Sequence, residues 1–379
     1  MRHHNHTCPK VIIILLLMFF YTAKPCLAAV PDSISNHLSD FDYMVQTTEK
    51  NYFAFPFIMQ HGFGKEYKQL KSGLRKKVKK GKMGIEQATC EYAYWFFHKF
   101  DAHFYVDHPL FWDTYYVKSH TNYKSLFNYA PKAVSCKADI ETWLIRVPSC
   151  EGKAPTFEWF SKAVQAFLSS GCKNLIIDVR GNTGGSDTMW EPIGNILVDH
   201  AKITHDSICF RNTDTNLAFY RRQLSDQTDN EWLKSFIARC ESTSDEFVKV
   251  EDDDSDDEEL PHSELPLKAA VIIDNRTASS AETLVRFVND YCNPQRTRVY
   301  GKESTWGANK TGNEIGSVLP NSKLMFYYPT CGNIPFFQQD GQVVPGIAPD
   351  VKIELPYPSM LTDNVDEWVI WVAKQLKTK

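Results

Sequence analysis

Two adjacent serines, Ser279 and Ser280, stand where the apolar run "AAVIID" (269–274) gives way to the helical-looking run "SSAETLVRFVNDY" (279–291). A serine at such a strand-to-helix turn is exposed beside the first backbone N–H groups of the helix. These N–H groups and the helix dipole stabilise an oxyanion that forms on a bound substrate. One of the two serines is therefore a candidate nucleophile.

The same stretch has a structural interpretation. Serine is a common helix N-cap, and Glu282 follows Ser279 at the spacing of a capping box. From these residues alone a cap is the more ordinary interpretation, and nothing ranks Ser279 against Ser280.

A second motif is "LIIDVRGNTGG" (175–185), an apolar strand that runs into a glycine-rich loop. Glycines let the backbone approach a ligand closely, although a tight turn alone would explain them. The loop has neither the Lys-Ser/Thr of a P-loop nor the GxGxxG order of a dinucleotide site. Asp178 and Arg180 are expected to hold it by charge-assisted hydrogen bonds.

Taken together, five stretches resemble, in order and spacing, the motifs of peptidase family S41. This family contains the tail-specific or C-terminal processing peptidases and is related to the tricorn core and the interphotoreceptor retinoid-binding repeats. The stretches are "WLIRVPSC", "NLIIDVRGNTGG", "VIIDNRTASSAE", "VYGKESTWG" and "GIAPDV". The resemblance implies an α/β fold with an S41-type (ClpP/crotonase-like) core, and serine peptidase chemistry with no metal and no cofactor.

The resemblance also assigns roles to residues of the two motifs. The family nucleophile stands three residues before a glutamate, which is the position of Ser279 here. Ser280 then supplies one oxyanion-hole N–H, and Gly184 or Gly185 supplies the second.

The general base is where this chain departs from the Ser-Lys members of the family. Their lysine follows a Thr-aromatic-Gly turn directly, but here Ala308 has that position, with Lys310 and Lys302 as nearby alternatives. The tricorn-like branch uses a histidine upstream of the core, and "FDAHFYV" is similar to that segment. His103 is therefore the expected base, and the ordinary histidine pKa near about 6.5 suits proton transfer.

Other residues near these motifs leave alternatives open. His98 and His108 flank the expected base, and a histidine in an aromatic strand often serves packing alone. The family's histidine-orienting glutamate has no clear match before "GIAPDV", so Asp340 and Glu314 are the candidates for that role.

The helical and strand-like patterns predict the elements that hold these residues. Apolar positions at helical spacing predict helices through about 35–100, and strand–helix–strand units after 155 predict parallel pairing in an α/β layer fold. The predicted divisions are a signal peptide (1–28), a helical N-terminal region (29–100), the peptidase core (101–362) with an acidic loop at about 241–263, and a C-terminal helix (363–379). A PDZ domain of roughly 90 residues does not fit between "FDAHF" and "WLIRV".

The N-terminus reads as an export signal. Arg2 and Lys10 precede and adjoin the apolar run 11–20, and small residues end at Ala28. The protein is expected in the periplasm or secreted, without stable membrane insertion after cleavage; a retained N-terminal anchor is the alternative. A net charge of −4 and the lack of a basic repeat give no indication of a nucleic-acid partner.

Eight cysteines follow the predicted signal peptide, an even number that permits up to four disulfides in an exported chain. The pairs closest in sequence are Cys136–Cys150 and Cys209–Cys240. The run "EDDDSDDEEL" (251–260) is predicted to be a solvated loop, because its charges repel one another.

These observations predict an exported serine endopeptidase that cleaves proteins or peptides through an acyl-enzyme on Ser279. A catalytically inactive S41-like protein that binds peptides or ligands is one alternative, and a serine esterase or amidase is another. The sequence does not indicate the substrate sequence or the oligomeric state.

Overall fold

The computed structural model describes residues 33–116, 128–198, 202–203, 208–250, 258–259, 263–334 and 346–378. The signal peptide, the acidic run other than Glu258–Glu259, and Asp340 lie outside these residues, and what the sequence predicts for them stays a prediction. No helix among the described residues is long and apolar enough to cross a membrane.

A six-stranded sheet forms the centre of the fold. Its order is β13-β10-β9-β4-β3-β2, and every neighbouring pair is parallel except β2 with β3, so the predicted parallel pairing is confirmed. The strands are β2 Val134–Lys137, β3 Thr142–Arg146, β4 Asn174–Asp178, β9 Lys268–Ile273, β10 Thr297–Gly301 and β13 Val351–Lys352.

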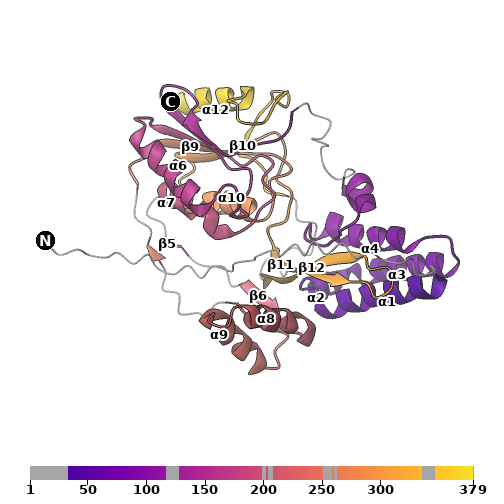
Figure 1. Ribbon diagram of the computed structural model, residues 1–379. Helices are drawn as coiled ribbons and strands as arrows, with labels where there is room; N and C mark the ends of the chain where they lie inside the picture. Colours follow the sequence, from indigo (N-terminus) through magenta and orange to yellow (C-terminus); the bar gives the residue numbers. More distant parts are fainter. Residues whose placement is uncertain are drawn as a thin grey trace.

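Helices cover both faces of this sheet (Figure 1). Side chains alternate between the faces of a strand, so Ile145 and Ile177 pack with α6, α7 and α10, whereas Leu144 and Ile176 pack beneath α12. The helices are α6 Phe157–Ser169, the 3-10 turn η4 Asp187–Trp190, α7 Glu191–Leu197, α10 Ser280–Tyr291 and α12 Glu367–Lys377. The result is the predicted α/β layer fold.

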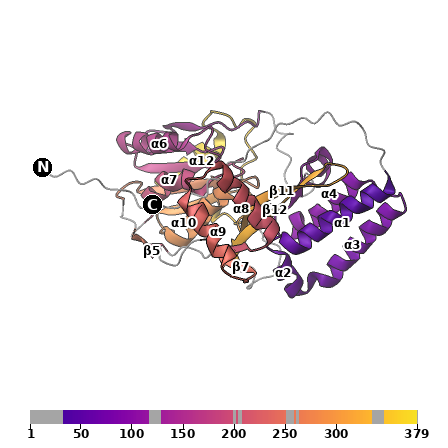
Figure 2. The ribbon, with the colours of Figure 1, turned by 60° about the horizontal axis from the view of Figure 1, so that its bottom comes forward.

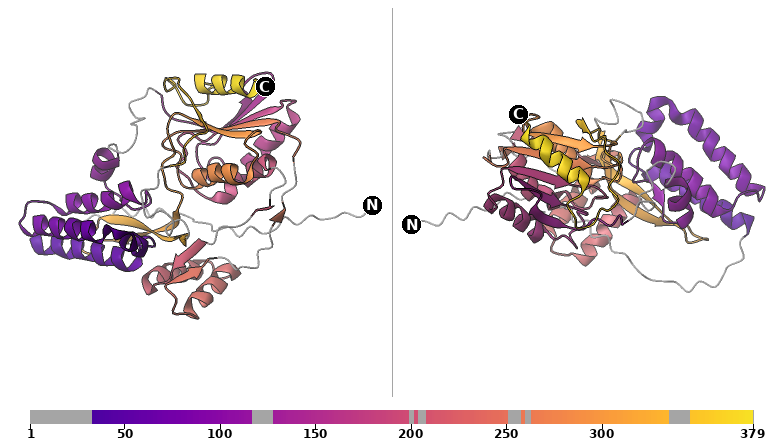
Figure 3. Two further views of the ribbon diagram at one scale, coloured as in Figure 1. Left: turned by 180° about the vertical axis from the view of Figure 1, so that it is seen from behind. Right: turned by 90° about the horizontal axis from the view of Figure 1, so that it is seen from above.

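The N-terminal helices form a second body of structure, and it contains a hairpin from much later in the chain (Figure 3). The helices are α1 Ile34–Asn51, α2 Phe55–Ile58, the π-helical turn η1 Met59–Phe63, α3 Gly64–Lys79 and α4 Ile85–Lys99, with the π-helical turn η2 Phe111–Tyr116 after β1. The hairpin joins β11 Thr311–Val318 to β12 Met325–Asn333. Its side chains Ile315 and Phe326 share one apolar cluster with these helices. Asp40 of α1 fixes the hairpin turn by accepting hydrogen bonds from the backbone N–H groups of Asn321 and Ser322.

Strand β12 also belongs to a second, smaller sheet of order β1-β12-β6-β7, with β11 beside β12. The strands are β1 Tyr105–Val106, β6 Ile208–Arg211 and β7 Phe247–Lys249; a separate pair joins β5 Lys202–Ile203 to β8 Glu258–Glu259. Helices α8 Asp214–Asp226 and α9 Glu231–Glu241 pack on this sheet (Figure 2). The sequence patterns did not predict either helix, because α8 and α9 bury few residues, such as Leu217 and Phe236.

The eight cysteines at 90–331 are all free thiols in this structure. Cys136 packs beneath α12, and Cys150 packs on the opposite face of the central sheet. Cys209 and Cys240 likewise belong to different apolar clusters, which the small sheet separates. Neither of these two pairs, which are the closest in sequence, is bridged in this structure.

Candidate active site

Ser279 has an unusual backbone for a residue that opens a helix. Other hydroxyl caps, Ser33, Thr156 and Thr213, are extended (Thr156 has φ −91° and ψ 162°), and their side chains accept a hydrogen bond from the helix. Ser279 instead has φ 53° and ψ −124°, between β9 and α10. Positive φ in a residue other than glycine is strained and persists where surrounding contacts enforce it. Ser279 is thus the N-cap of α10 and forms the expected capping box with Glu282, but its backbone differs from that of the extended caps.

The glycine-rich loop presses directly against this serine. A Cβ added to Gly184, whose φ is +108°, would lie 2.6 Å from Ser279 Cβ. One at Gly185 would lie 2.1 Å from the carbonyl carbon and oxygen of Cys150. The loop and the serine turn are also joined by hydrogen bonds, for example Ala278 N–H to Asn182 O at 2.9 Å. Only glycine fits at 184 and 185, and the two motifs singled out in the sequence meet at this point.

Two backbone N–H groups beside Ser279 have no acceptor among the described residues. The Gly184 N–H donates to Asn182 Oδ1 at 2.8 Å. Gly185 forms a parallel bridge with Cys150, in which Gly184 O accepts from Cys150 N–H and Ser186 N–H donates to Cys150 O. The Gly185 N–H itself makes no hydrogen bond with the described residues. Ser280 is the first residue of α10, and its N–H has no partner within the helix. Gly185 and Ser280 are thus the available donors for an oxyanion.

Glu282 ties the serine to the Thr-Trp-Gly turn. Its buried carboxylate accepts hydrogen bonds from Ser279 N–H (3.1 Å), Thr305 Oγ1 (2.5 Å), Gly307 N–H (2.7 Å) and Ala308 N–H (2.6 Å). Burial raises the pKa of Glu282, while these hydrogen bonds oppose the rise. Ala308 occupies the position where Ser-Lys members carry their lysine. Its backbone N–H, through Glu282, helps to hold the turn that carries Ser279.

His103 lies in the turn between α4 and β1, and it is 7% exposed. Its Nδ1 is 3.3 Å from Thr311 Oγ1 and 3.5 Å from Asp101 Oδ1. The Thr311 hydroxyl donates its single proton to Asp101 Oδ1 at 2.7 Å, so it can only accept from the histidine. Nδ1 must then carry a proton, which leaves Nε2 of the neutral ring as the basic nitrogen.

Asp101 is the carboxylate that orients this ring, and it is held by residues of the helical region. It accepts hydrogen bonds from the His103 backbone N–H at 3.0 Å and from the Tyr52 hydroxyl at 2.9 Å. Burial lowers the pKa of His103. The hydrogen bond to Asp101 and the charges of Glu314, Asp101 and Glu282 outweigh that effect and raise the pKa to about 9.

The remaining sequence candidates have other surroundings. Lys302 Nζ donates to Leu355 O at 3.0 Å and lies over the Tyr357 ring, so its ammonium contacts the C-terminal segment. Lys310 stands just before β11, where its carbonyl accepts from Asn333 N–H. Glu314 affects His103 through its charge.

The flanking histidines also have other contacts. His98 stacks on Tyr94, and His108 Nδ1 accepts from the backbone N–H of Leu110. Neither histidine has the arrangement that Asp101 and Thr311 give to His103.

Ser279 and His103 come from different parts of the fold, and no hydrogen bond joins the Ser279 hydroxyl to the His103 ring. Trp306 links the two parts. Its backbone N–H donates to Thr277 O at 2.9 Å, two residues before Ser279, and its ring contacts Phe97 of α4, the helix that precedes His103. Catalytic hydrogen bonds in free enzymes are often longer than in substrate complexes. Among the described residues no group of three or more His, Cys, Asp or Glu side chains is placed to hold a metal ion.

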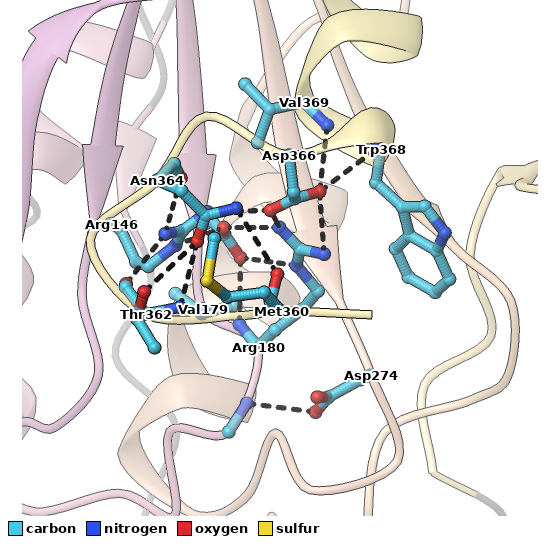
Figure 4. Close-up of polar contacts among 12 residues, drawn as sticks. Arg146, Val179, Arg180, Asp274, Met360, Thr362, Asn364, Asp366, Trp368 and Val369 are labelled. Atoms are coloured by element: carbon cyan, nitrogen blue, oxygen red, sulfur yellow. Dashed lines mark hydrogen bonds and ion pairs between the residues drawn. The ribbon is translucent and has the colours of Figure 1, made fainter. Parts of the chain in front are cut away.

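Figure 4 shows the buried ionic cluster next to the start of the glycine-rich loop. Arg146 and Arg180 each bind both Asp178 and Asp366, at distances of 2.7–3.3 Å, and all four side chains are buried. The two guanidinium charges hold the pKa of Asp178 far below its usual range despite burial. The predicted structural role of Asp178 and Arg180 is confirmed. Asp366 additionally caps α12, so the cluster joins the loop to the C-terminal helix.

Comparison with known proteins gives the class of this fold and site. The family model of peptidase family S41 matches residues 142–353, and the chain belongs to that family. Two solved structures have similar folds, each with a TM-score of 0.50. A candidate peptidase from Parabacteroides merdae is 15% identical, over 85% of this chain and 90% of its own. Mature CPAF is 12% identical, over 84% of this chain and 93% of its own. No curated protein sequence matches the chain.

Sequence reasoning missed Asp101 and Thr311 as partners of the histidine. Asp101 stands two positions before His103 in "FDAHFYV", but nothing in that segment assigns it a role. Thr311 gave no signal, because it is 208 residues away in sequence and meets the histidine only through the fold.

Proposed function

We propose that the protein is a serine peptidase in which Ser279 attacks the scissile carbonyl and His103 is the general base. The observation that carries this proposal is the strained backbone of Ser279, pressed by Gly184 into a conformation that a helix cap does not need. Strain of this kind collects at functional sites. The S41 membership of residues 142–353 supports the same chemistry.

In this mechanism His103 Nε2 removes the Ser279 hydroxyl proton as the oxygen bonds to the carbonyl carbon. The N–H groups of Ser280 and Gly185 stabilise the resulting oxyanion. The imidazolium then protonates the leaving amine, which produces an acyl-enzyme, and water releases the acid in the reverse sequence. Asp101, through Thr311, keeps the proton on Nδ1 and stabilises the imidazolium.

A fluorophosphonate probe tests the nucleophile, because it forms a covalent bond only with an activated serine. We expect the wild-type protein and the Ser280→Ala variant to be labelled, and Ser279→Ala to be unlabelled. Digestion of casein by the same three proteins then tests for peptidase activity. Labelling of Ser279→Ala, or no labelling of the wild type beside a reactive control hydrolase, would contradict the proposal.

A second candidate is an S41-like protein that binds peptides without cleaving them. The observation in its favour is that no hydrogen bond joins Ser279 to His103. The two candidates differ in one measurement: if a peptide library binds the protein but is recovered intact, and the fluorophosphonate does not react, the binding function is the correct one. Activity on small esters together with inert casein would instead indicate an esterase.

A further inference from the structure

The outer face of α3 carries a concentration of positive charge that the proposed peptidase function does not use. Six exposed lysines lie along this helix and the turn after it: Lys65, Lys68, Lys76, Lys79, Lys80 and Lys82. Other cations of the helix are paired, for example Arg75 with Asp42 at 2.8 Å and Lys71 with Glu49 at 2.7 Å. The six lysines have no carboxylate partner among the described residues. This unpaired charge stands out in a chain whose net charge is −4.

This basic face is directed away from the catalytic residues. The helix packs its buried side chains, Tyr67, Leu74 and Val78, toward the rest of the bundle. It contacts α1, α4 and η1, and it lies on the side of the helical region far from the central sheet (Figure 2). A partner bound to the basic face would therefore leave the junction between Ser279 and His103 open to substrate.

The composition of the face indicates what kind of partner fits it. No large apolar side chain is exposed between 64 and 82, so the face offers charge and no apolar anchor. Lysine is a strongly hydrated point charge, suited to a diffuse layer of anions rather than to one planar, bidentate ligand. A layer of phosphate headgroups has this character.

The end of the helix also adjoins the point where the described chain begins. A Cβ added to Gly81 would lie 3.6 Å from Ile34 Cδ1, at the start of α1. The apolar run 11–20 stands upstream in the sequence, and the 13 intervening residues reach at most about 45 Å when extended. The basic face therefore lies near the point where the described chain begins, which follows the predicted export signal in the sequence.

We propose that the basic face of α3 docks the protein on a surface of anionic phospholipid. Each cation near such a surface strengthens binding about fivefold, and the attraction is screened by salt. Binding is peripheral: the lysines contact headgroups, and no helix inserts.

Sedimentation with sucrose-loaded vesicles tests this docking, using the exported protein as the cell processes it. Vesicles of phosphatidylcholine with phosphatidylglycerol are compared with phosphatidylcholine alone, in 0.05 M and in 0.5 M salt (roughly a threefold change in screening length). We expect binding only to the anionic vesicles and loss of binding at high salt. Equal binding to both vesicles, or no binding to either, overturns the proposal.

A matched pair of variants locates the surface. Replacing Lys76, Lys79, Lys80 and Lys82 by Gln is expected to weaken binding at least about 100-fold. Replacing Lys132, Lys153, Lys162 and Lys352, which are exposed elsewhere, removes the same charge and is expected to change binding much less. Urea unfolding of both variants checks that they are folded. Equal loss in the two variants, or binding of poly-glutamate in place of vesicles, would show that α3 is not a lipid-docking face.

Discussion

The Thr311 hydroxyl donates its proton to Asp101 Oδ1 across 2.7 Å, and this one bond decides which nitrogen of His103 is basic. Because the threonine has no second proton to give, the 3.3 Å contact with Nδ1 requires a proton on the ring at that position. Nε2 is then the nitrogen that would accept the Ser279 proton in the proposed mechanism. A residue from a late hairpin thus sets the chemistry of a residue from the helical region.

Removing that hydroxyl should impair the base without removing it. In Thr311→Val the hydrogen bonds to Asp101 and His103 are lost, and the rate of fluorophosphonate labelling should fall about 10- to 100-fold, the value of a hydrogen bond to a charged group. Thr311→Ser keeps the hydroxyl and should stay within a few-fold of the wild type. If both variants lose the same activity, packing of the threonine methyl group is what matters.

The labelling rate should rise steeply with pH. His103 is protonated below its pKa of about 9, so the neutral base increases about tenfold per pH unit up to that value and then levels off. In Asp101→Asn the hydrogen bond and charge that raise the pKa are removed, so the midpoint should move to lower pH while the maximal rate falls. The rate measured from pH 6 to 10 checks both statements; a flat wild-type profile would count against His103.

Glu282 should matter through its charge as well as its contacts. In Glu282→Gln the amide N–H₂ must face at least one of the N–H donors that now share the carboxylate, and one of the charges that raise the His103 pKa is lost. We expect a roughly 10- to 100-fold lower labelling rate, on the order of one charged hydrogen bond. We also expect the midpoint of the pH profile to move to lower pH.

A control for Glu282 lies at the other end of the same helix. Asp290→Asn removes an exposed charge that pairs only with Arg286 at 3.6 Å, and it should leave rate and pH profile unchanged. If the pH profile of the labelling rate does not shift in Glu282→Gln, then Glu282 has a structural role only.

The contact between Gly184 and Ser279 makes a further prediction. In Gly184→Ala the new Cβ would lie 2.6 Å from Ser279 Cβ, so it must push Ser279 aside. The φ of +108° is also unfavourable for alanine. Labelling should be nearly abolished, and the free energy of unfolding should fall by about 1–3 kcal/mol. Gly73→Ala, where nothing lies within 4 Å, should keep full labelling and a stability equal to or above the wild type. Normal labelling of Gly184→Ala would mean that the loop is free to retreat.

The buried ionic cluster predicts a large effect on stability. Asp366→Ala leaves Arg146 and Arg180 with one carboxylate for two buried guanidinium groups and removes the cap of α12. Breaking such a cluster costs roughly 3–5 kcal/mol of unfolding free energy. Asp363→Ala removes an exposed neighbour paired with Lys132 at 3.5 Å, and it should leave the urea midpoint close to that of the wild type. Equal urea midpoints for the two variants would refute this assignment.

Much of the central fold could be predicted from the sequence because its signals are local. The apolar runs at β4 and β9 are buried along nearly their whole length, and Gly171 at φ +77° follows α6 as expected of a helix stop. The contact between the glycine-rich loop and the serine turn could be expected from the resemblance to peptidase family S41, in which both motifs contribute to one site. The strained backbone of Ser279 could not be predicted from the sequence, because helix-capping propensity is the same for every serine that opens a helix.

What could not be predicted depends on contacts between distant segments. Asp101 and Thr311 meet because the β11–β12 hairpin inserts among the N-terminal helices, and no spacing in the sequence encodes this. Helices α8 and α9 were missed because their apolar stripes are narrow within a polar segment. Nearness in sequence likewise does not indicate which thiols lie on the same face of a sheet, as Cys136 and Cys150 show.

The insertion of the β11–β12 hairpin among the N-terminal helices also determines when the enzyme can first act. His103 and Asp101 leave the ribosome long before Thr311, and the turn at Asn321 must reach Asp40 before the hairpin is held. A chain that is still being synthesised or threaded through a membrane therefore has its base without the residue that selects the tautomer. In the proposed mechanism the base therefore reaches full activity only once nearly the whole chain has folded, so the order of these residues along the chain would delay cleavage until late in synthesis.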